Sequence, residues 1–76
     1  MKIAIKYFAS MRDSMGKSDE SVDLDSNATV EDLWGKVSEN SLPDNTLIAV
    51  NMEYTNIGHV LKDGDEVAFF PPVTGG

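Results

Sequence analysis

The first residues of the chain alternate between apolar and polar side chains. Within residues 2–9, Ile3, Ile5 and Tyr7 occupy every second position. Phe8 falls on the other side, together with the lysines. Because successive side chains of a strand point to opposite faces of a sheet, this pattern predicts a half-buried strand.

A second strand is predicted at residues 20–24, where Val22 and Leu24 take the inward positions. The connection at residues 10–17 is mostly polar and has room for one helical turn. We therefore expect the first two strands to form a hairpin.

The clearest helix signal begins at Thr29. Its side chain can cap a helix, and Asp32 three residues later completes a weaker form of the capping box. Apolar residues then recur at the helical spacing i, i+3, i+4 and i+7, at Val30, Leu33, Trp34 and Val37. The stripe ends by Asn40, and Pro43 breaks the helix.

The second half of the chain predicts two more strands. Residues 47–50 form a short apolar run, residues 51–58 are interpreted as irregular and polar, and residues 62–65 form a strong turn signal. Residues 66–70 give the last strand. Two prolines end this strand, because proline cannot donate a ladder hydrogen bond.

Phe69 and Phe70 must lie on opposite faces of the last strand. We expect Val67 and Phe69 to face the core, which leaves Phe70 available to a partner.

One helix packed on one face of a mixed sheet is an α+β fold. A ubiquitin-like β-grasp results if the first and last strands lie side by side at the centre of the sheet. We expect a single β-grasp domain over residues 1–72, followed by a flexible C-terminal tail over residues 73–76.

The amino-acid composition argues against two classes of binding partner. The 76 residues include 13 acidic and 6 basic side chains, for a formal net charge of −7. Nucleic-acid binding requires clustered lysine and arginine, and an anionic membrane surface attracts the same residues, so neither partner is expected. The acidity suits solubility or steering toward a basic protein.

The residue types that the sequence lacks limit the chemistry that the protein can perform and indicate its compartment. There is no cysteine and a single histidine, His59, so neither a catalytic thiol nor a metal site is expected. The lack of cysteine fits a reducing compartment. The alternating start is typical of a strand rather than a signal peptide, and no apolar run approaches the roughly 20 residues that span a bilayer. We therefore expect a cytoplasmic protein.

The sequence closes on Gly75 and Gly76 after two prolines. Two residues without side chains can pass through a channel that excludes other residues. Fully extended, residues 73–76 span roughly 13 Å at about 3.3 Å per residue. The expected role of this tail is to deliver the Gly76 carboxylate into a site on another protein.

Three stretches of the sequence resemble one known family. They are Tyr7-Phe8-Ala9 with Arg12 and Gly16, then Ala49-Val50-Asn51, and above all residues 63–76, which read DGDEVAFFPPVTGG. The last stretch resembles, along its whole length, the C-terminal signature of the small, sulfur-carrying subunit of molybdopterin synthase (the MoaD family). The similarity extends over the entire chain.

This resemblance implies a function and a set of partners. A ubiquitin-activating-type adenylyltransferase would adenylate the Gly76 carboxylate with ATP and Mg²⁺, and a sulfur donor would displace AMP to leave a thiocarboxylate. Bound to the large catalytic subunit of a heterotetramer, the thiocarboxylate would attack cyclic pyranopterin monophosphate to build a dithiolene. No cofactor is expected to stay bound, and the catalytic groups would belong to the partners. The implied partner-binding residues are Phe70, Pro71, Pro72, Val73, Thr74 and Gly75.

Three alternatives remain open from the sequence. The chain can carry sulfur for thiamin synthesis or another pathway, can act as a ubiquitin-like modifier that forms isopeptide bonds, or can be an interaction module with an idle tail. Met11, Met15 and Met52 fit either an adhesive surface or loop and core packing, because methionine adapts to irregular contacts.

Overall fold

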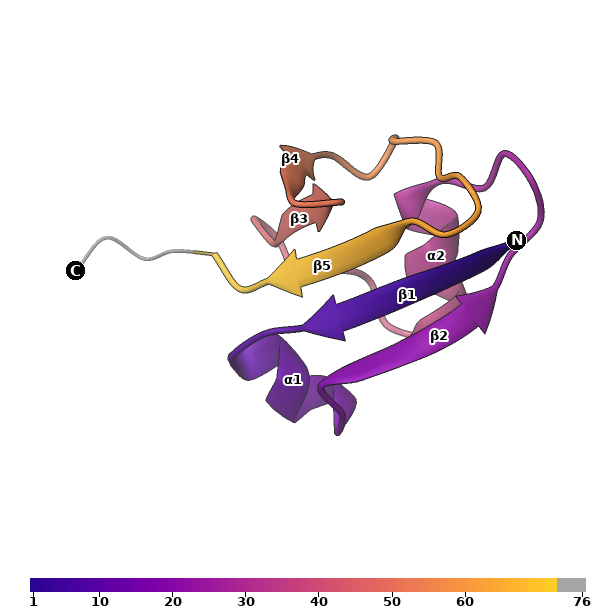
Figure 1. Cartoon of the computed structure of the whole chain (residues 1–76). Coiled ribbons are helices and arrows are strands. Elements are labelled where there is room, and N and C mark those ends of the chain that lie inside the picture. Colours follow the sequence, from indigo (N-terminus) through magenta and orange to yellow (C-terminus); the bar gives the residue numbers. More distant parts are fainter. Residues whose placement is uncertain (73–76) are drawn as a thin grey trace.

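One mixed sheet and two helices make up the part of the chain that the structure, a computed structural model, describes, residues 1–72 (Figure 1). The strands are β1 (Lys2–Tyr7), β2 (Asp19–Asp23), β3 (Leu47–Val50), β4 (Glu53–Thr55) and β5 (Glu66–Phe70). The helices are α1 (Ser10–Met15) and α2 (Val30–Val37).

The first and last strands lie side by side, as expected for a β-grasp. The order in the sheet is β2-β1-β5-β3-β4. β1 and β5 pair in parallel, with Ile5 opposite Val67 and Tyr7 opposite Phe69, whereas the other neighbours are antiparallel. The predicted hairpin of β1 and β2 is confirmed, with α1 in its connection.

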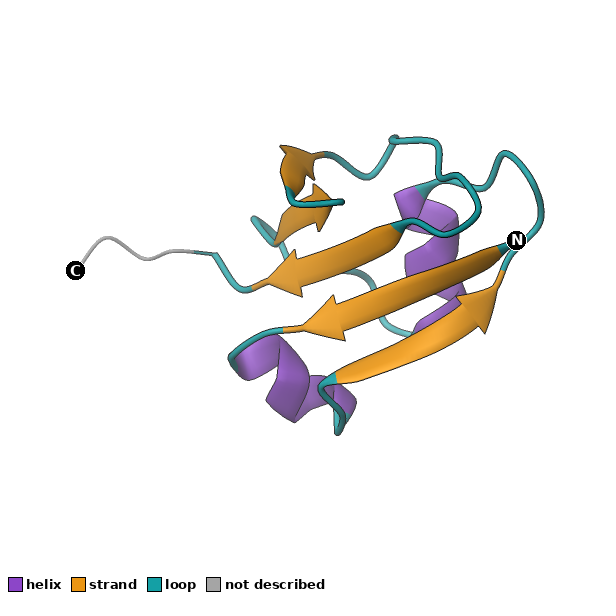
Figure 2. Cartoon of the chain, in the orientation of Figure 1, coloured by secondary structure: helices purple, strands orange, loops and turns teal. Residues whose placement is uncertain are grey.

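The core lies between the sheet and α2, which covers one face of the sheet (Figure 2). Phe69 is fully buried there, and the Trp34 ring meets its ring edge-on at 5.1 Å between centroids. The Trp34 indole N–H donates a 2.8 Å hydrogen bond to the backbone oxygen of Asn40, which ties the segment after α2 to the core. The predicted inward residues of β1, namely Ile3, Ile5 and Tyr7, are all buried.

The predicted start of α2 is confirmed. The Thr29 hydroxyl accepts from the backbone N–H of Asp32 at 3.2 Å, and the Asp32 carboxylate accepts from the backbone N–H of Thr29 at 2.9 Å. This is a complete capping box, with aspartate in the position that glutamate more often fills. It satisfies two donors that the first turn of a helix cannot bond internally.

At the β1–β2 hairpin, a buried phenol is held neutral. The Tyr7 hydroxyl donates a 2.6 Å hydrogen bond to the carboxylate of Glu20 across the two strands. Burial, followed by this hydrogen bond and the charge of Glu20, raises the pKa of Tyr7 far above its ordinary value. Tyr7 is therefore a core aromatic residue whose hydroxyl group has a hydrogen-bond partner.

The interpretation of residues 51–58 as irregular was wrong, because Glu53–Thr55 form β4. This strand pairs antiparallel with β3, and Tyr54 lies opposite Ala49. Three residues are too few to show an alternation, and the preceding turn, Asn51-Met52, lacks the glycine that usually marks a hairpin.

The connection between β1 and β2 is more ordered than the sequence indicates. Residues Ser10–Met15 form a helix that ends at Gly16, which has φ +74° and donates its N–H to the oxygen of Arg12. Met11 is buried on the core side of this helix. Met11, together with the partly buried Met15, thus fixes a segment whose other residues are polar.

Candidate functional site

The two faces of β5 differ in burial. Val67 and Phe69 are completely buried under α2, as expected. Phe70, Ala68 and Glu66 alternate with them and are only half buried, on the face that α2 leaves open. The partner-facing position predicted for Phe70 is therefore on the uncovered face of the sheet.

Aromatic side chains from three strands or strand ends gather around Phe70. Its ring stacks on that of Phe8, with centroids 4.6 Å apart and planes inclined by 8°. The Tyr54 ring lies 6.4 Å from the Phe70 ring at a tilt of 59°. Offset and tilted ring pairs of this kind stabilise one another beyond their simple burial.

Small residues form the floor between the aromatic side chains. Ala49 pairs with Ala68 on one side and with Tyr54 on the other. Their methyl groups leave a shallow hollow on the sheet. We call this surface the aromatic face, and its residues are Phe8, Ala49, Met52, Tyr54, Ala68 and Phe70.

The aromatic face is exposed to a degree that folding alone does not explain. Phe8 is 40% exposed, Tyr54 74% and Met52 93%. Single exposed apolar residues are common on proteins, but a contiguous group of them is typical of a binding surface. The described part of the chain therefore presents a surface suited to an apolar partner.

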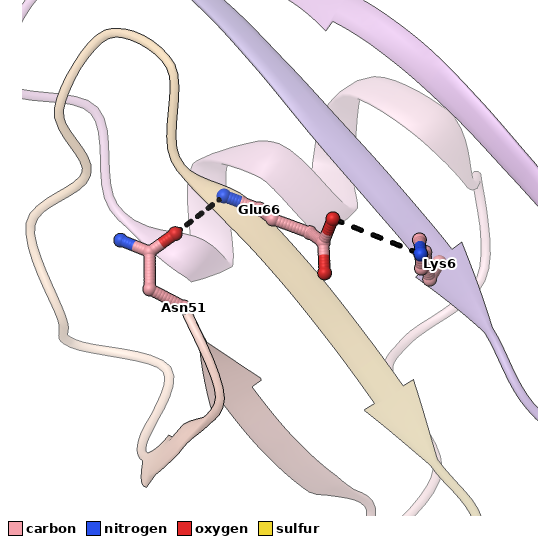
Figure 3. A network of polar contacts seen from close by, with 3 residues as sticks. All are labelled: Lys6, Asn51 and Glu66. Carbon is pink, nitrogen blue, oxygen red and sulfur yellow. Dashed lines mark hydrogen bonds and ion pairs between the residues drawn. The ribbon is translucent and has the colours of Figure 1, made fainter.

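An ion pair borders the hollow. Lys6 of β1 and Glu66 of β5 approach to 3.8 Å between Nζ and Oε2, and both side chains are about half exposed (Figure 3). An exposed pair of this kind contributes little to stability. It lies at the boundary between the apolar surface and the charged side chains of the sheet.

The aromatic face lies next to the start of the tail. Pro71 and Pro72 follow Phe70 directly, Pro71 half buried and Pro72 exposed. The other predicted site residues, Val73, Thr74, Gly75 and Gly76, lie outside the described residues. The structure thus brings Phe70, Pro71 and Pro72 to the edge of an apolar surface that sequence reasoning did not define.

Sequence reasoning missed Phe8 and Tyr54 as parts of this surface. The alternation of β1 had put Phe8 on the polar side, and an aromatic residue at an outward position was the available signal. Tyr54 gave no such signal because its strand was not predicted. Of the three methionines considered, Met52 is on the aromatic face, whereas Met11 is in the core and Met15 packs against it.

A second hollow lies between α1 and the segment that follows α2, bordered by Met11, Trp34 and Pro43. Most of its remaining lining is serine, asparagine and glutamate. It presents less apolar surface than the aromatic face and does not include the residues that lead into the tail. We therefore place the candidate site on the aromatic face.

The described residues, 1–72, contain no group of three histidine, cysteine, aspartate or glutamate side chains placed to hold a metal ion. Within the same range, neither helix has the length and apolar character needed to cross a bilayer.

Comparison with known proteins identifies relatives that are similar over most of the chain. Residues 5–76 match the ThiS family. The molybdopterin synthase sulfur carrier subunit of Escherichia coli (strain K12) is 42% identical, over 97% of this chain and 99% of that protein. The small archaeal modifier protein 1 of Haloferax volcanii is 33% identical, over 93% of this chain and 97% of that protein.

Solved structures of similar proteins share the fold. The crystal structure of SAMP1 from Haloferax volcanii has a TM-score of 0.81 at 31% identity and full coverage of both chains. A putative molybdopterin converting factor subunit 1 from Pyrococcus furiosus has a TM-score of 0.79 at 35% identity, covering 96% of this chain and 99% of that one. A chain of the Helicobacter pylori complex of molybdopterin-converting factor subunits 1 and 2 shares the fold at 22% identity, with a TM-score of 0.70 and full coverage of both chains.

Proposed function

The chain belongs to the ThiS family, and we propose that it is a sulfur carrier in molybdenum cofactor biosynthesis, the small subunit of a molybdopterin synthase. The observation that carries the proposal is the 42% identity, along almost the whole of both chains, to a molybdopterin synthase sulfur carrier subunit. The resemblance inferred from residues 63–76 is confirmed by these relatives, and the β-grasp fold by the structural neighbours.

The chemistry proposed for Gly76 follows from the weakness of a carboxylate as an electrophile. Its charge is delocalised and its oxygen is a poor leaving group. Attack of the carboxylate on ATP with Mg²⁺, in a ubiquitin-activating-type adenylyltransferase, forms an acyl adenylate and releases pyrophosphate. A sulfur donor then displaces AMP, and the product is a thiocarboxylate with one oxygen replaced by sulfur.

In the proposed transfer, the thiocarboxylate enters the active site of the larger subunit and its sulfur attacks cyclic pyranopterin monophosphate. Two transfers build the dithiolene. This chain supplies the sulfur and the reach of its tail, whereas the partners supply the catalytic groups. The proposed assembly is a heterotetramer of two small and two large subunits.

The aromatic face is the proposed docking surface for the larger subunit. It includes Phe70, which directly precedes Pro71, so a partner that covers it holds the start of the tail in a fixed place. Pro71 and Pro72 each fix one backbone dihedral angle, which limits the directions that the tail can take. The net charge of −7 favours a partner whose surface around the contact is basic.

The test is the intact mass of the chain after incubation with its cognate activating enzyme, ATP, Mg²⁺ and a sulfur source. We expect a gain equal to the exchange of one oxygen for sulfur, and no gain in a variant that lacks Gly76. An unchanged mass with a demonstrably active activating enzyme would refute the carrier function. Co-purification with a pterin-binding subunit, rather than a thiazole synthase, identifies the pathway.

Protein modification is the second candidate function. It is favoured by the similarity to a protein named small archaeal modifier protein 1. As a modifier, the activated Gly76 would form an isopeptide bond with a lysine of another protein. Tagged chain isolated from cells under denaturing conditions should then carry lysine adducts that disappear when Gly76 is deleted.

A further inference from the structure

The turn between β3 and β4 has an unusual backbone. Asn51 and Met52 both have positive φ, +51° and +71°. They form a two-residue hairpin loop, closed by the pairing of Val50 with Glu53. Asparagine tolerates this left-handed conformation, but the usual second residue is glycine, because other side chains clash with the backbone there. Met52 therefore occupies a position where glycine is the better fit.

The side chain of Asn51 clamps this turn to the start of β5 (Figure 3). Its amide oxygen accepts from the backbone N–H of Glu66 at 3.0 Å, and its amide nitrogen donates to the Asp65 carboxylate at 2.9 Å. The backbone N–H of Asn51 also donates to the oxygen of Glu66 at 2.8 Å. Strained conformations persist where surrounding contacts determine them, and the Asn51 clamp provides those contacts.

Nothing in the packing of the domain accounts for methionine in this turn. Met52 is 93% exposed, the most exposed of the large apolar side chains in the described part of the chain. It adds almost no buried surface to the fold. However, it is part of the aromatic face and lines the same hollow as Tyr54 and Phe70. The strained turn therefore places Met52 on a surface that extends to Phe70, the residue before the tail.

We propose that Met52 is an affinity-determining contact for the larger synthase subunit, held in place by the Asn51 clamp. This inference rests on the proposed function. The expected receptor is an apolar recess on the larger subunit, with basic side chains around it to match the net charge of −7. Methionine suits such a recess because its thioether side chain is unbranched and adapts to irregular surfaces.

Two substitutions separate the side chain from the backbone. M52G removes the thioether and relieves the positive φ, whereas M52A removes the thioether and keeps the strain. Calorimetric titration against the larger subunit from the same organism should show both variants binding about tenfold more weakly than the unmodified chain, the change expected for the loss of one well-packed apolar contact. The melting temperature should rise for M52G and stay near the original for M52A.

The matched control is N27G. Asn27 is also exposed with positive φ, +69°, but lies between β2 and α2, away from the aromatic face. This variant should bind the larger subunit as the unmodified chain does. N51A, which removes the clamp and leaves Met52 in place, should also weaken binding.

The outcomes distinguish the two levels of inference. If the unmodified chain binds the larger subunit and both Met52 variants bind within twofold of it, the role of Met52 is wrong and the proposed function stands. If the unmodified chain neither binds the larger subunit nor gains sulfur at Gly76, the proposed function itself fails.

Discussion

At the scale of single residues, two adjacent phenylalanines have different surroundings. Phe69 is fully buried against Trp34, whereas Phe70 is half buried and stacks on Phe8. The period of two along β5 puts neighbours on opposite faces. Core packing therefore falls to Phe69, and the proposed docking surface includes its neighbour Phe70.

We expect alanine to act mainly on stability at Phe69 and mainly on partner binding at Phe70. Phe69→Ala removes a core ring and should cost about 3–5 kcal/mol of unfolding free energy, a large part of the stability of a small domain. Phe70→Ala removes a partly exposed ring and its stacking on Phe8. It should cost about 1 kcal/mol of unfolding free energy and sharply reduce binding to the larger subunit. Urea unfolding and calorimetric titration measure the two effects. Equal losses of stability would contradict the division.

Asp65 couples the stability of the domain to pH. Its burial acts to raise its pKa, but the hydrogen bonds from the Lys62 backbone N–H and the Asn51 amide, with nearby His59 and Lys62, lower the pKa below the ordinary 3.8. Because the pKa is lower in the folded chain, the carboxylate stabilises the fold above 3.8. This stabilisation is lost as the pH falls through the folded-state pKa.

We therefore expect Asp65→Asn to be less stable than the unmodified chain at pH 7 and to lose less stability on acidification. Urea unfolding of both proteins at pH 7, 4 and 2.5 gives the difference, in which the other carboxylates largely cancel. The gap between the two proteins should narrow below about pH 4, the region of the unfolded pKa. A gap that stays constant would show that Asp65 does not contribute in this way.

At the scale of secondary structure, the capping box is the contact that fixes where α2 begins. Thr29→Ala removes the hydroxyl that accepts from the Asp32 backbone, and should cost about 1 kcal/mol. Thr29→Ser keeps an oxygen at the same place and should cost much less. Thermal unfolding of the pair provides the measurement. Similar losses for both variants would indicate that the methyl group, rather than the cap, is responsible.

Elements with strong local signals were predictable from the sequence. The bounds of β3 and β5 and the start of α2 follow from apolar runs, a turn and a cap, and the structure matches them. β4 was not predictable, because its three residues are held by pairing with β3 rather than by their own pattern. The order of α1 depends on the contacts of Met11 and Met15 with the core, which only the tertiary structure reveals.

The candidate site was predictable only in part, for a related reason. Phe70, Pro71 and Pro72 are consecutive, so the sequence indicated them directly. Phe8 and Tyr54 reach the same surface from the end of β1 and from β4, and no local pattern states that these segments meet. Predicting a surface that is assembled from distant segments requires knowledge of the order of the strands in the sheet.

At the scale of the whole molecule, the charge of −7 should govern how fast partners meet. Association between oppositely charged proteins is accelerated at low ionic strength and slows as salt screens the charges. We expect the association rate with the larger subunit to fall by tenfold or more between about 10 mM and 500 mM salt, and the dissociation rate to change little. Stopped-flow fluorescence of a dye attached to the larger subunit measures this rate. A salt-independent association rate would mean that the acidic surface takes no part.

The central position of β5 has a consequence for synthesis in the cell. β5 pairs with both β1 and β3, so the sheet has no centre until residues 66–70 are available. On the ribosome, the domain must therefore wait for one of its last-made segments before it can fold. Parallel pairing of the first strand with the last also requires a large loop to close, which slows folding. Until that step is complete, β1 and β3 lack the strand that lies between them, and the net charge of −7 is a property of the unfolded chain that opposes its aggregation.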